Sequence, residues 1–261
     1  MRTNCKNHIF TFLKKTNFVE IGSFEVRGLR CAELKQDLFS LLAENGAELM
    51  GVADLSDIIS GEMQTGIAVA VSVPVNIVKD LQTAPTKEYY DAYYTLNAML
   101  DDIVTCGAEF LKENGDQAFA NTTKVVKQND NWCTPLPHKT VAARAGLGWI
   151  GKNCLLVTER YGSAVRLSSF LTNAPMPAEK PVNESKCGKC PACVQKCPAK
   201  ALTGVLWNRT IRREQILRKE DCKEMQIQRM KKATGIATDL CGLHFAVCPY
   251  TQRFVNRNTH I

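Results

Sequence analysis

Four cysteines in the second half of the chain constrain its fold more than any other feature. Cys187, Cys190, Cys193 and Cys197 precede Pro198 with the spacing C-x2-C-x2-C-x3-C-P. Three closely spaced thiolates at this spacing bind one 4Fe–4S cluster, whereas the fourth serves a neighbouring cluster. The motif therefore predicts an iron–sulfur protein with a second group of ligands elsewhere in its sequence.

A second, altered group lies near the C-terminal end of the sequence. Cys241, His244 and Cys248 precede Pro249 with the spacing C-x2-H-x3-C-P, and Cys222 lies upstream. In a two-cluster protein, the last cysteine of each motif crosses over to the other cluster. The predicted ligand sets are Cys187, Cys190, Cys193 and Cys248 for the first cluster, and Cys197, Cys222, Cys241 and His244 for the second.

Alternatives remain open at both motifs. Imidazole can replace thiolate on iron, so His244 is the predicted eighth ligand. It could instead be a polar residue near a cluster with three protein ligands, or the second cluster could have been lost. Zinc is the main alternative at the first motif, because cysteine pairs at this spacing also suit a tetrahedral ion. Four cysteines within eleven residues, followed by proline, favour iron–sulfur.

Composition argues against several classes of protein. The chain has 261 residues and 12 cysteines, seven of them in ligand-like positions after residue 186, which is unlike a secreted disulfide scaffold. The N-terminal sequence lacks the apolar run of a signal peptide. The most hydrophobic stretch, residues 66–78, is shorter than the roughly 20 residues that span a bilayer. We expect a cytoplasmic protein with no membrane partner.

The charge of the chain is concentrated in its cysteine-rich part. Of the formal net charge of +7, residues 179–261 contribute sixteen Lys/Arg against seven Asp/Glu, and the remainder is slightly acidic. Such a region could dock an acidic electron donor, such as a ferredoxin or flavodoxin, or a phosphate-bearing RNA. It could equally offset the negative charge of thiolate-ligated clusters.

Periodicity predicts mixed helices and strands before the cysteine motifs. Expected helices cover residues 31–46, 88–114 and 139–145, and expected strands cover 47–54, 65–78, 154–158 and 164–171. Residues 173–184 contain three prolines and are expected to be a linker. The fold class that follows is α+β, with a three-layer core around a central sheet in residues 1–178 and a ferredoxin-like two-cluster domain in residues 179–261.

A glycine-rich segment at residues 144–153, RAGLGWIGKN, matches two nucleotide-binding patterns only in part. A dinucleotide fingerprint follows a strand and opens a helix, whereas a helix-like segment precedes this one. A phosphate loop of the G-x-x-x-x-G-K-S/T type needs a hydroxyl where this chain has Asn153. The glycines permit close approach to another ligand, with Trp149 as an apolar wall, or they form a tight structural connection.

Residues 138–173 and the two cysteine motifs together resemble the epoxyqueuosine reductase family. The segment reads HKTVAARAGLGWIGKNCLLVTERYGSAVRLSSFLTN, and the resemblance extends over residues 34–252. It implies a cobalamin-dependent reductase related to reductive dehalogenases, in which two 4Fe–4S clusters pass electrons to cobalt and the cofactor carries the difficult chemistry. By position in the motif, the loop expected beside the corrinoid comprises Arg144, Gly146, Gly148, Trp149, Gly151, Lys152 and Asn153.

One departure from the family pattern concerns the proton donor. The family carries D-T-G-P-x-x-D/E-R before the glycine segment, whereas this chain has Trp132 at the first aspartate, the proposed donor, and His138 at the later acidic position. An acid near the leaving oxygen assists epoxide reduction, so its absence argues against the tRNA activity and indicates a divergent paralogue. His138, with an ordinary pKa near neutrality, and Asp130 are the candidate donors.

Three functions are compatible with the sequence. The first is a cobamide-dependent iron–sulfur oxidoreductase that acts on an unknown substrate. The second is an electron-transfer protein without enzymatic activity, which serves a partner. The third, RNA binding for its own sake, rests only on the basic excess of residues 179–261 and is not favoured. Corrinoid bound in stoichiometric amount would distinguish the first function from the second.

Overall fold

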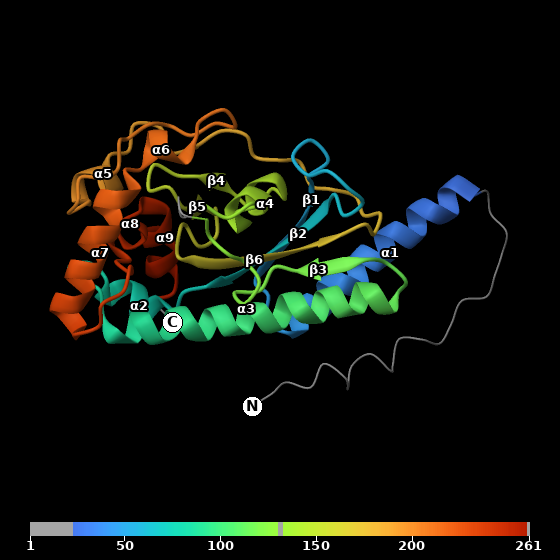
Figure 1. Ribbon diagram of the computed structural model, residues 1–261, viewed down its shortest axis with the longest axis horizontal. Helices are drawn as coiled ribbons and strands as arrows, with labels where there is room; N and C mark the ends of the chain where they lie inside the picture. The colour runs from blue at the N-terminus through green and yellow to red at the C-terminus, as the bar shows by residue number, and fades with distance from the viewer. Residues whose placement is uncertain (1–22, 130–132, 260–261) are drawn as a thin grey trace.

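A four-stranded antiparallel sheet lies at the centre of the molecule (Figure 1). The computed structural model describes residues 23–129 and 133–259. The sheet has the order β1-β2-β6-β3 and comprises β1 (Leu49–Asp54), β2 (Thr65–Ser72), β6 (Val165–Thr172) and β3 (Ala118–Ala120). β2 and β6 pair from Thr65 opposite Thr172 to Ser72 opposite Val165. This register determines which side chains face each side of the sheet.

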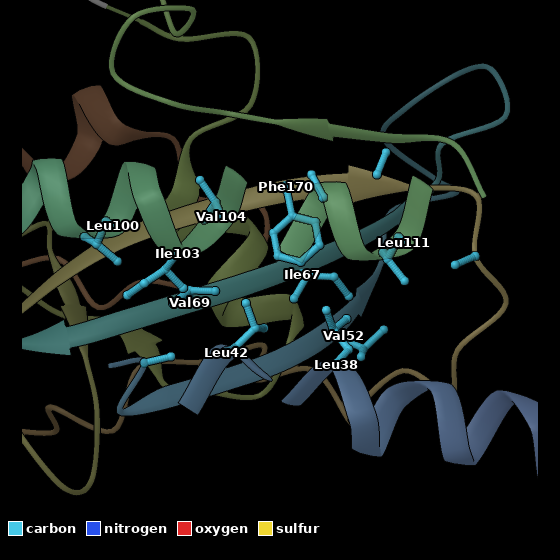
Figure 2. Packing of buried hydrophobic residues seen from close by; sticks show 14 of the residues in the cluster. Leu38, Leu42, Val52, Ile67, Val69, Leu100, Ile103, Val104, Leu111 and Phe170 are labelled. Carbon is cyan, nitrogen blue, oxygen red and sulfur yellow. The ribbon is translucent and has the colours of Figure 1, made fainter. Parts of the chain in front are cut away.

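Helices cover both faces of the sheet. The helices of this region are α1 (Ser23–Glu44), α2 (Val75–Asp80), α3 (Lys87–Glu113) and α4 (His138–Arg144). α1 and α3 pack on one face, where Leu42 and Ile103 join Ile67 of β2 in one buried cluster (Figure 2). On the other face Ala68 of β2 is buried with Val141 of α4. The predicted core, three layers around a central sheet, is confirmed.

α3 begins and packs as its sequence dictates. The Thr86 side chain accepts a hydrogen bond from the backbone N–H of Tyr89 at 3.2 Å, which satisfies one of the free donors of the first turn. Gly107 lets the helix approach the sheet closely, because a Cβ there would lie 2.8 Å from the ring of Phe170 on β6. The expected helix 88–114 therefore agrees with the structure within about a residue.

Two of the expected strands are wrong in extent. The strand expected over 65–78 ends at Ser72, and Pro74 precedes α2 instead. Proline has no N–H to donate to a sheet, but it suits the start of a helix. The strand expected over 154–158 is reduced to β5 (Leu156–Val157), which forms a separate two-stranded sheet with β4 (Trp149–Ile150).

The C-terminal region is built from helices and connecting loops. It contains α5 (Ala192–Lys196), α6 (Arg213–Ile216), α7 (Lys219–Thr234), α8 (Leu243–Ala246) and α9 (Pro249–Arg257). Met230 of α7 and Phe254 of α9 share a buried cluster with Leu81, and Phe245 of α8 meets Tyr89 of α3 edge to face at 5.6 Å between ring centroids. These contacts join the cysteine-rich region to the sheet domain.

Two further predictions concern the domain boundary and membrane-spanning helices. The segment between β6 and α5, which holds the predicted boundary at residues 178 and 179, contains neither helix nor strand. The boundary itself stays a prediction. None of the helices in the described ranges combines the length and the apolar character that crossing a lipid bilayer requires.

Candidate iron–sulfur and cofactor site

Four of the predicted ligands surround one cavity, here called the first cysteine cavity. Cys187, Cys190, Cys193 and Cys248 line this space of about 200 Å³. The first three come from the loop before α5 and from α5 itself, and Cys248 precedes α9. Burial, followed by the neighbouring thiols, raises the pKa of Cys193 to about 12. Four thiolates would therefore repel one another here unless positive charge, such as that of iron, lay between them.

The remaining four predicted ligands also meet, in the second cysteine cavity. Cys197, Cys222, Cys241 and His244 line a narrow space of about 20 Å³. Gln226 donates a hydrogen bond to the Cys222 sulfur at 2.8 Å. Burial raises the pKa of Cys222 to about 11 and lowers that of His244 to about 4. His244 is therefore neutral at pH 7, which is the form of imidazole that binds metals.

The first cysteine cavity suits a cluster better than one zinc ion. A zinc ion needs all its sulfur ligands about 2.3 Å from one point, whereas these four side chains surround about 200 Å³. In the part of the chain that the structure describes, no three His, Cys, Asp or Glu side chains are arranged to hold a single ion. In a 4Fe–4S cluster, each ligand can instead bind its own iron.

Basic side chains surround the first cysteine cavity. Lys152, Lys186 and Arg253 line it, and no Asp or Glu is among its lining residues within the described ranges. The Lys152 ammonium donates hydrogen bonds to the carbonyl oxygens of Gly188 at 2.8 Å and Cys190 at 3.2 Å. Lys152 thus ties the β4–β5 hairpin to the cysteine loop and places positive charge beside the thiols.

A third cavity connects the sheet with the second cysteine cavity. This His138 pocket has a volume of about 450 Å³, and its wall includes His138 and Arg166. Cys222, Cys241 and His244, three members of the second ligand set, also line it. A ligand in the pocket would therefore lie directly beside the second cysteine cavity.

His138 is partly buried and lies within the electrostatic influence of Arg166 and Asp101. Its Nδ1 is 2.9 Å from the Ser169 hydroxyl oxygen. Arg166 donates to the Asn97 side-chain oxygen at 2.9 Å and lies 4.1 Å from the Tyr93 ring centroid. Burial, and then the charge of Arg166, lower the pKa of His138 to about 4. The expectation of an ordinary pKa for His138 is wrong for this reason.

A fourth cavity adjoins the His138 pocket. This Trp207 pocket, of about 690 Å³, shares Lys139, Cys154 and Arg213 with the His138 pocket. Lys139 Nζ donates to the Cys154 carbonyl at 2.8 Å and lies 3.5 Å from its sulfur. The charged side chains in the wall are Lys139, Arg144, Arg209, Arg212, Arg213, Asp57 and Glu214. Cations outnumber carboxylates, so the Trp207 pocket favours a ligand with negative charge.

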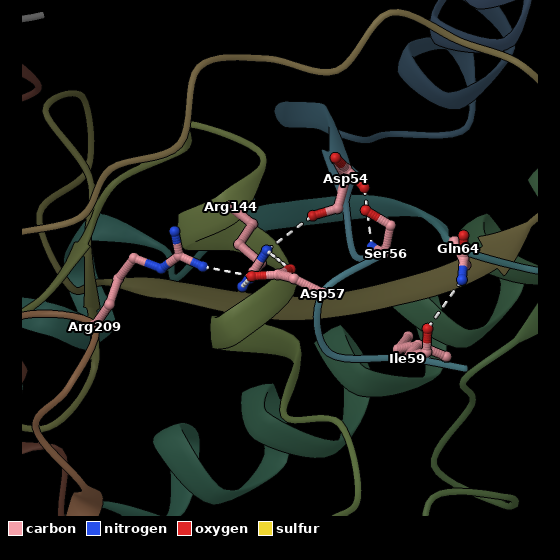
Figure 3. Close-up of polar contacts among 7 residues, drawn as sticks. All are labelled: Asp54, Ser56, Asp57, Ile59, Gln64, Arg144 and Arg209. Atoms are coloured by element: carbon pink, nitrogen blue, oxygen red, sulfur yellow. Dashed lines mark hydrogen bonds and ion pairs between the residues drawn. The ribbon is translucent and has the colours of Figure 1, made fainter.

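An ion-pair network fixes one edge of the Trp207 pocket. Arg144, at the end of α4, forms a bidentate pair with Asp57 at 2.6 and 2.7 Å, and Arg209 contacts the same carboxylate at 2.8 Å (Figure 3). These hydrogen bonds, above all those from Arg144, lower the pKa of Asp57 to about 2. Arg144 therefore has a structural partner as well as a place in the pocket wall.

The glycine segment mainly forms a tight connection. A Cβ on Gly148 would overlap the Val157 carbonyl oxygen, and Trp149 is buried. Among the seven loop residues expected beside the corrinoid, Asn153 lines the His138 pocket and Arg144 lines the Trp207 pocket. The other five, Gly146, Gly148, Trp149, Gly151 and Lys152, are in the wall of neither pocket, so their positions add no support to that role.

Sequence reasoning missed several residues of the pockets, and two of its residues cannot be placed. Asp130 and Trp132 lie outside the described residues. Lys139, Cys154 and Arg166 were not singled out. Cys154 has a φ of +62°, which is uncommon for a residue other than glycine and often marks a functional site. No pattern in the sequence reveals that backbone conformation.

Comparison with known proteins relates the C-terminal region to iron–sulfur proteins. Residues 186–251 match the family described as a 4Fe-4S double cluster binding domain. The chain is also 46% identical over 67 residues to an epoxyqueuosine reductase of Bacillus cereus, an alignment that covers 26% of this chain and 17% of that protein. The aligned part thus spans less than a fifth of this relative. The prediction of a two-cluster domain is confirmed.

Solved structures show the same fold over most of the chain. A reductive dehalogenase, whose structure is described as suggesting a mechanism for B12-dependent dehalogenation, has a TM-score of 0.67 at 15% identity and covers 87% of this chain and 34% of its own. An epoxyqueuosine reductase solved with an epoxyqueuosine-modified tRNA-Tyr stem loop has a TM-score of 0.55 at 22% identity and covers 84% and 66%. At these identities the likeness concerns the fold.

Proposed function

We propose that this epoxyqueuosine reductase-like chain is an iron–sulfur oxidoreductase, in which two 4Fe–4S clusters supply electrons to a cobamide that reduces a substrate still to be identified. The observation that carries the proposal is a shared wall. Cys222, Cys241 and His244 line both the second cysteine cavity and the His138 pocket. An electron on the second cluster would therefore lie beside any cofactor bound in that pocket.

The cysteine cavities would hold the clusters as crossed ligand sets. Cys248 lies with the thiols of the first motif, although it belongs to the second motif in sequence. Cys197 makes the reverse exchange and lies with Cys222 and Cys241. This is the arrangement that two adjacent cubanes require, with His244 as the eighth ligand. Binding would release the protons that burial keeps on these thiols.

The His138 and Trp207 pockets are the proposed cobamide site. Their volumes, about 450 and 690 Å³, fall within the range of small-molecule and cofactor sites, and the two share part of their walls. A bound cobamide would supply the redox chemistry. Asn153, Lys139 and Arg166 would contact it from the His138 pocket, and the basic wall of the Trp207 pocket would suit its phosphate. The fold shared with a B12-dependent dehalogenase supports this assignment.

Proton supply is the step for which this chain departs most from its relatives. His138 is neutral at pH 7 because its pKa is about 4, so it would orient a hydrogen bond through Ser169 rather than act as an imidazolium acid. Lys139, which lines both pockets, is another candidate donor. Asp130 stays a candidate donor. The substrate would differ from epoxyqueuosine-modified tRNA, because Trp132 replaces the acid of the family pattern.

Electrons would arrive through the first cluster. Three of its four cysteines are partly exposed, and Lys152, Lys186 and Arg253 surround the cavity. A positive rim of this kind attracts an acidic carrier such as a ferredoxin or flavodoxin. The second cluster, next to the His138 pocket, would then pass electrons to the cobamide.

Anaerobic reconstitution tests the proposal. The protein is treated with iron, sulfide and hydroxocobalamin, separated by gel filtration, and analysed for iron and cobalt. We expect about eight irons, as two cubanes require, and about one cobalt per chain. Iron without cobalt would instead support the second candidate, an electron-transfer protein. That function needs only the two clusters, and residues 186–251 match a double-cluster domain.

A further inference from the structure

Trp149 carries a buried hydrogen-bond donor that no described residue satisfies. The residue is only 1% exposed, and its indole Nε1–H has no hydrogen-bond acceptor. Buried polar groups nearly always have a partner, because an unmet donor loses its hydration without compensation. The neighbourhood of the indole therefore indicates what the partner is.

The neighbours of the indole belong to the first cysteine cavity. Trp149 shares a buried cluster with Cys248, and Cys187 packs against it. Tyr250 meets the ring at 4.9 Å between centroids, and Lys186 Nζ lies 5.2 Å from the ring centroid. All four of these neighbours line the cavity. The indole thus forms a second layer directly behind the ligands of the first cluster.

The backbone around Trp149 holds the indole in this position. Trp149 pairs with Val157 in the β4–β5 hairpin, and Gly148 allows the two strands to approach closely. Lys152 binds the hairpin to the cysteine loop through the Cys190 carbonyl at 3.2 Å. A side chain held on both sides keeps its donor in a fixed direction, as tuning of a metal site requires.

We propose that the Trp149 indole N–H donates a hydrogen bond to a sulfur of the first cluster, on its Cys248 side, and thereby raises the reduction potential of that cluster. A donor to sulfur offsets the negative charge that reduction adds, so it stabilises the reduced state. The inference rests on the part of the proposed function that places a cluster in this cavity, and it is independent of any cobamide. It gives the glycine segment a role at the cluster.

The test is an EPR-monitored redox titration of the reconstituted protein and its Trp149→Phe variant. Phenylalanine keeps an aromatic ring and removes the donor. We expect the potential of the first cluster to fall, with an equilibrium constant for reduction about tenfold smaller, which corresponds to about 59 mV for a one-electron couple. In protein labelled with indole-15N tryptophan, the reduced first cluster should show a nitrogen coupling that the variant lacks.

Two controls separate the hydrogen bond from packing. Replacing Trp149 with 3-benzothienylalanine keeps the shape of the indole without its N–H, and should lower the potential as phenylalanine does, even where phenylalanine weakens cluster binding. Tyr94→Phe removes a donor from an exposed aromatic ring that lines neither cysteine cavity, and should leave the potential unchanged. A wild-type potential in an iron-replete benzothienylalanine protein would overturn the proposal. Failure to assemble any cluster in the wild type would overturn the underlying function instead.

Discussion

The two cysteine cavities differ in size, in ligands and in what surrounds them. The first, of about 200 Å³, is lined by four cysteines and three cations. The second, of about 20 Å³, is lined by three cysteines and one histidine, with no Lys or Arg in its described wall. The second shares three of its predicted ligands, Cys222, Cys241 and His244, with the wall of the His138 pocket, whereas the first shares no ligand with it and meets it only at Asn153. Under the proposed electron route, the basic and partly exposed first cavity would receive electrons, and the more enclosed second cavity would deliver them.

The largest expected effect is loss of the first cluster in Cys193→Ser. Cys193 lines the first cysteine cavity, and the thiols of Cys248, Cys187 and Cys190 all contribute to its raised pKa. Serine is a poor iron ligand. We expect about half of the iron and sulfide to be lost, because one of two cubanes is missing. Cys31→Ser, a matched change outside both cavities, should retain full iron. Full iron in Cys193→Ser would remove this residue from the ligand set.

The next largest effect distinguishes the ligands of the second cluster. His244→Cys should lower the potential of that cluster alone, because thiolate puts more negative charge on iron than imidazole does. His244→Ala should reduce its iron content or change its EPR spectrum. Unchanged iron, sulfide and spectra in the alanine variant would show that His244 only lies near the cluster.

A smaller effect concerns the basic rim of the first cavity. Lys186→Glu should slow reduction by an acidic carrier severalfold at low ionic strength, with the difference vanishing at high salt. Lys186 is paired with Glu159 at 2.8 Å, so part of its charge is already offset. Lys112→Glu, at the far end of α3, is the matched control. Stopped-flow rates that do not depend on Lys186 would place donor docking elsewhere.

The smallest effect is a pH dependence of stability through His138. Its folded pKa of about 4 lies below the value near 6.5 of the unfolded chain, so the unfolded state binds more protons between these values. Stability should be highest above pH 6.5 and fall by up to about 1.4 kcal/mol per pH unit as the pH drops toward 4. His138→Gln should flatten this part of the urea-unfolding profile. If the profiles of the wild type and the variant ran parallel, they would contradict a neutral His138 imidazole in the folded protein.

The sequence predicted the features that depend on the spacing of residues and missed those that depend on contacts between distant segments. The gathering of Cys248 with the first motif followed from the motif alone, since ligand spacing carries the geometry of the cluster. Lys139 and Cys154 went unnoticed because their contact depends on a left-handed backbone at Cys154. Trp149 was assigned to a cofactor loop because its motif gives no direction for the side chain. Apolar content alone predicted a strand that continued through Pro74, whereas the structure ends this strand at Ser72.

The proposed electron route depends most on the second cluster lying beside the cobamide. In reconstituted protein with cobalt(II) cobalamin bound and the clusters reduced, EPR should show magnetic coupling between cobalt and the second cluster, and His244→Cys should change that coupling. The first cluster, none of whose predicted ligands lines the His138 pocket, should show a weaker interaction. Stoichiometric cobalt without any coupling to the second cluster would contradict the proposed electron route.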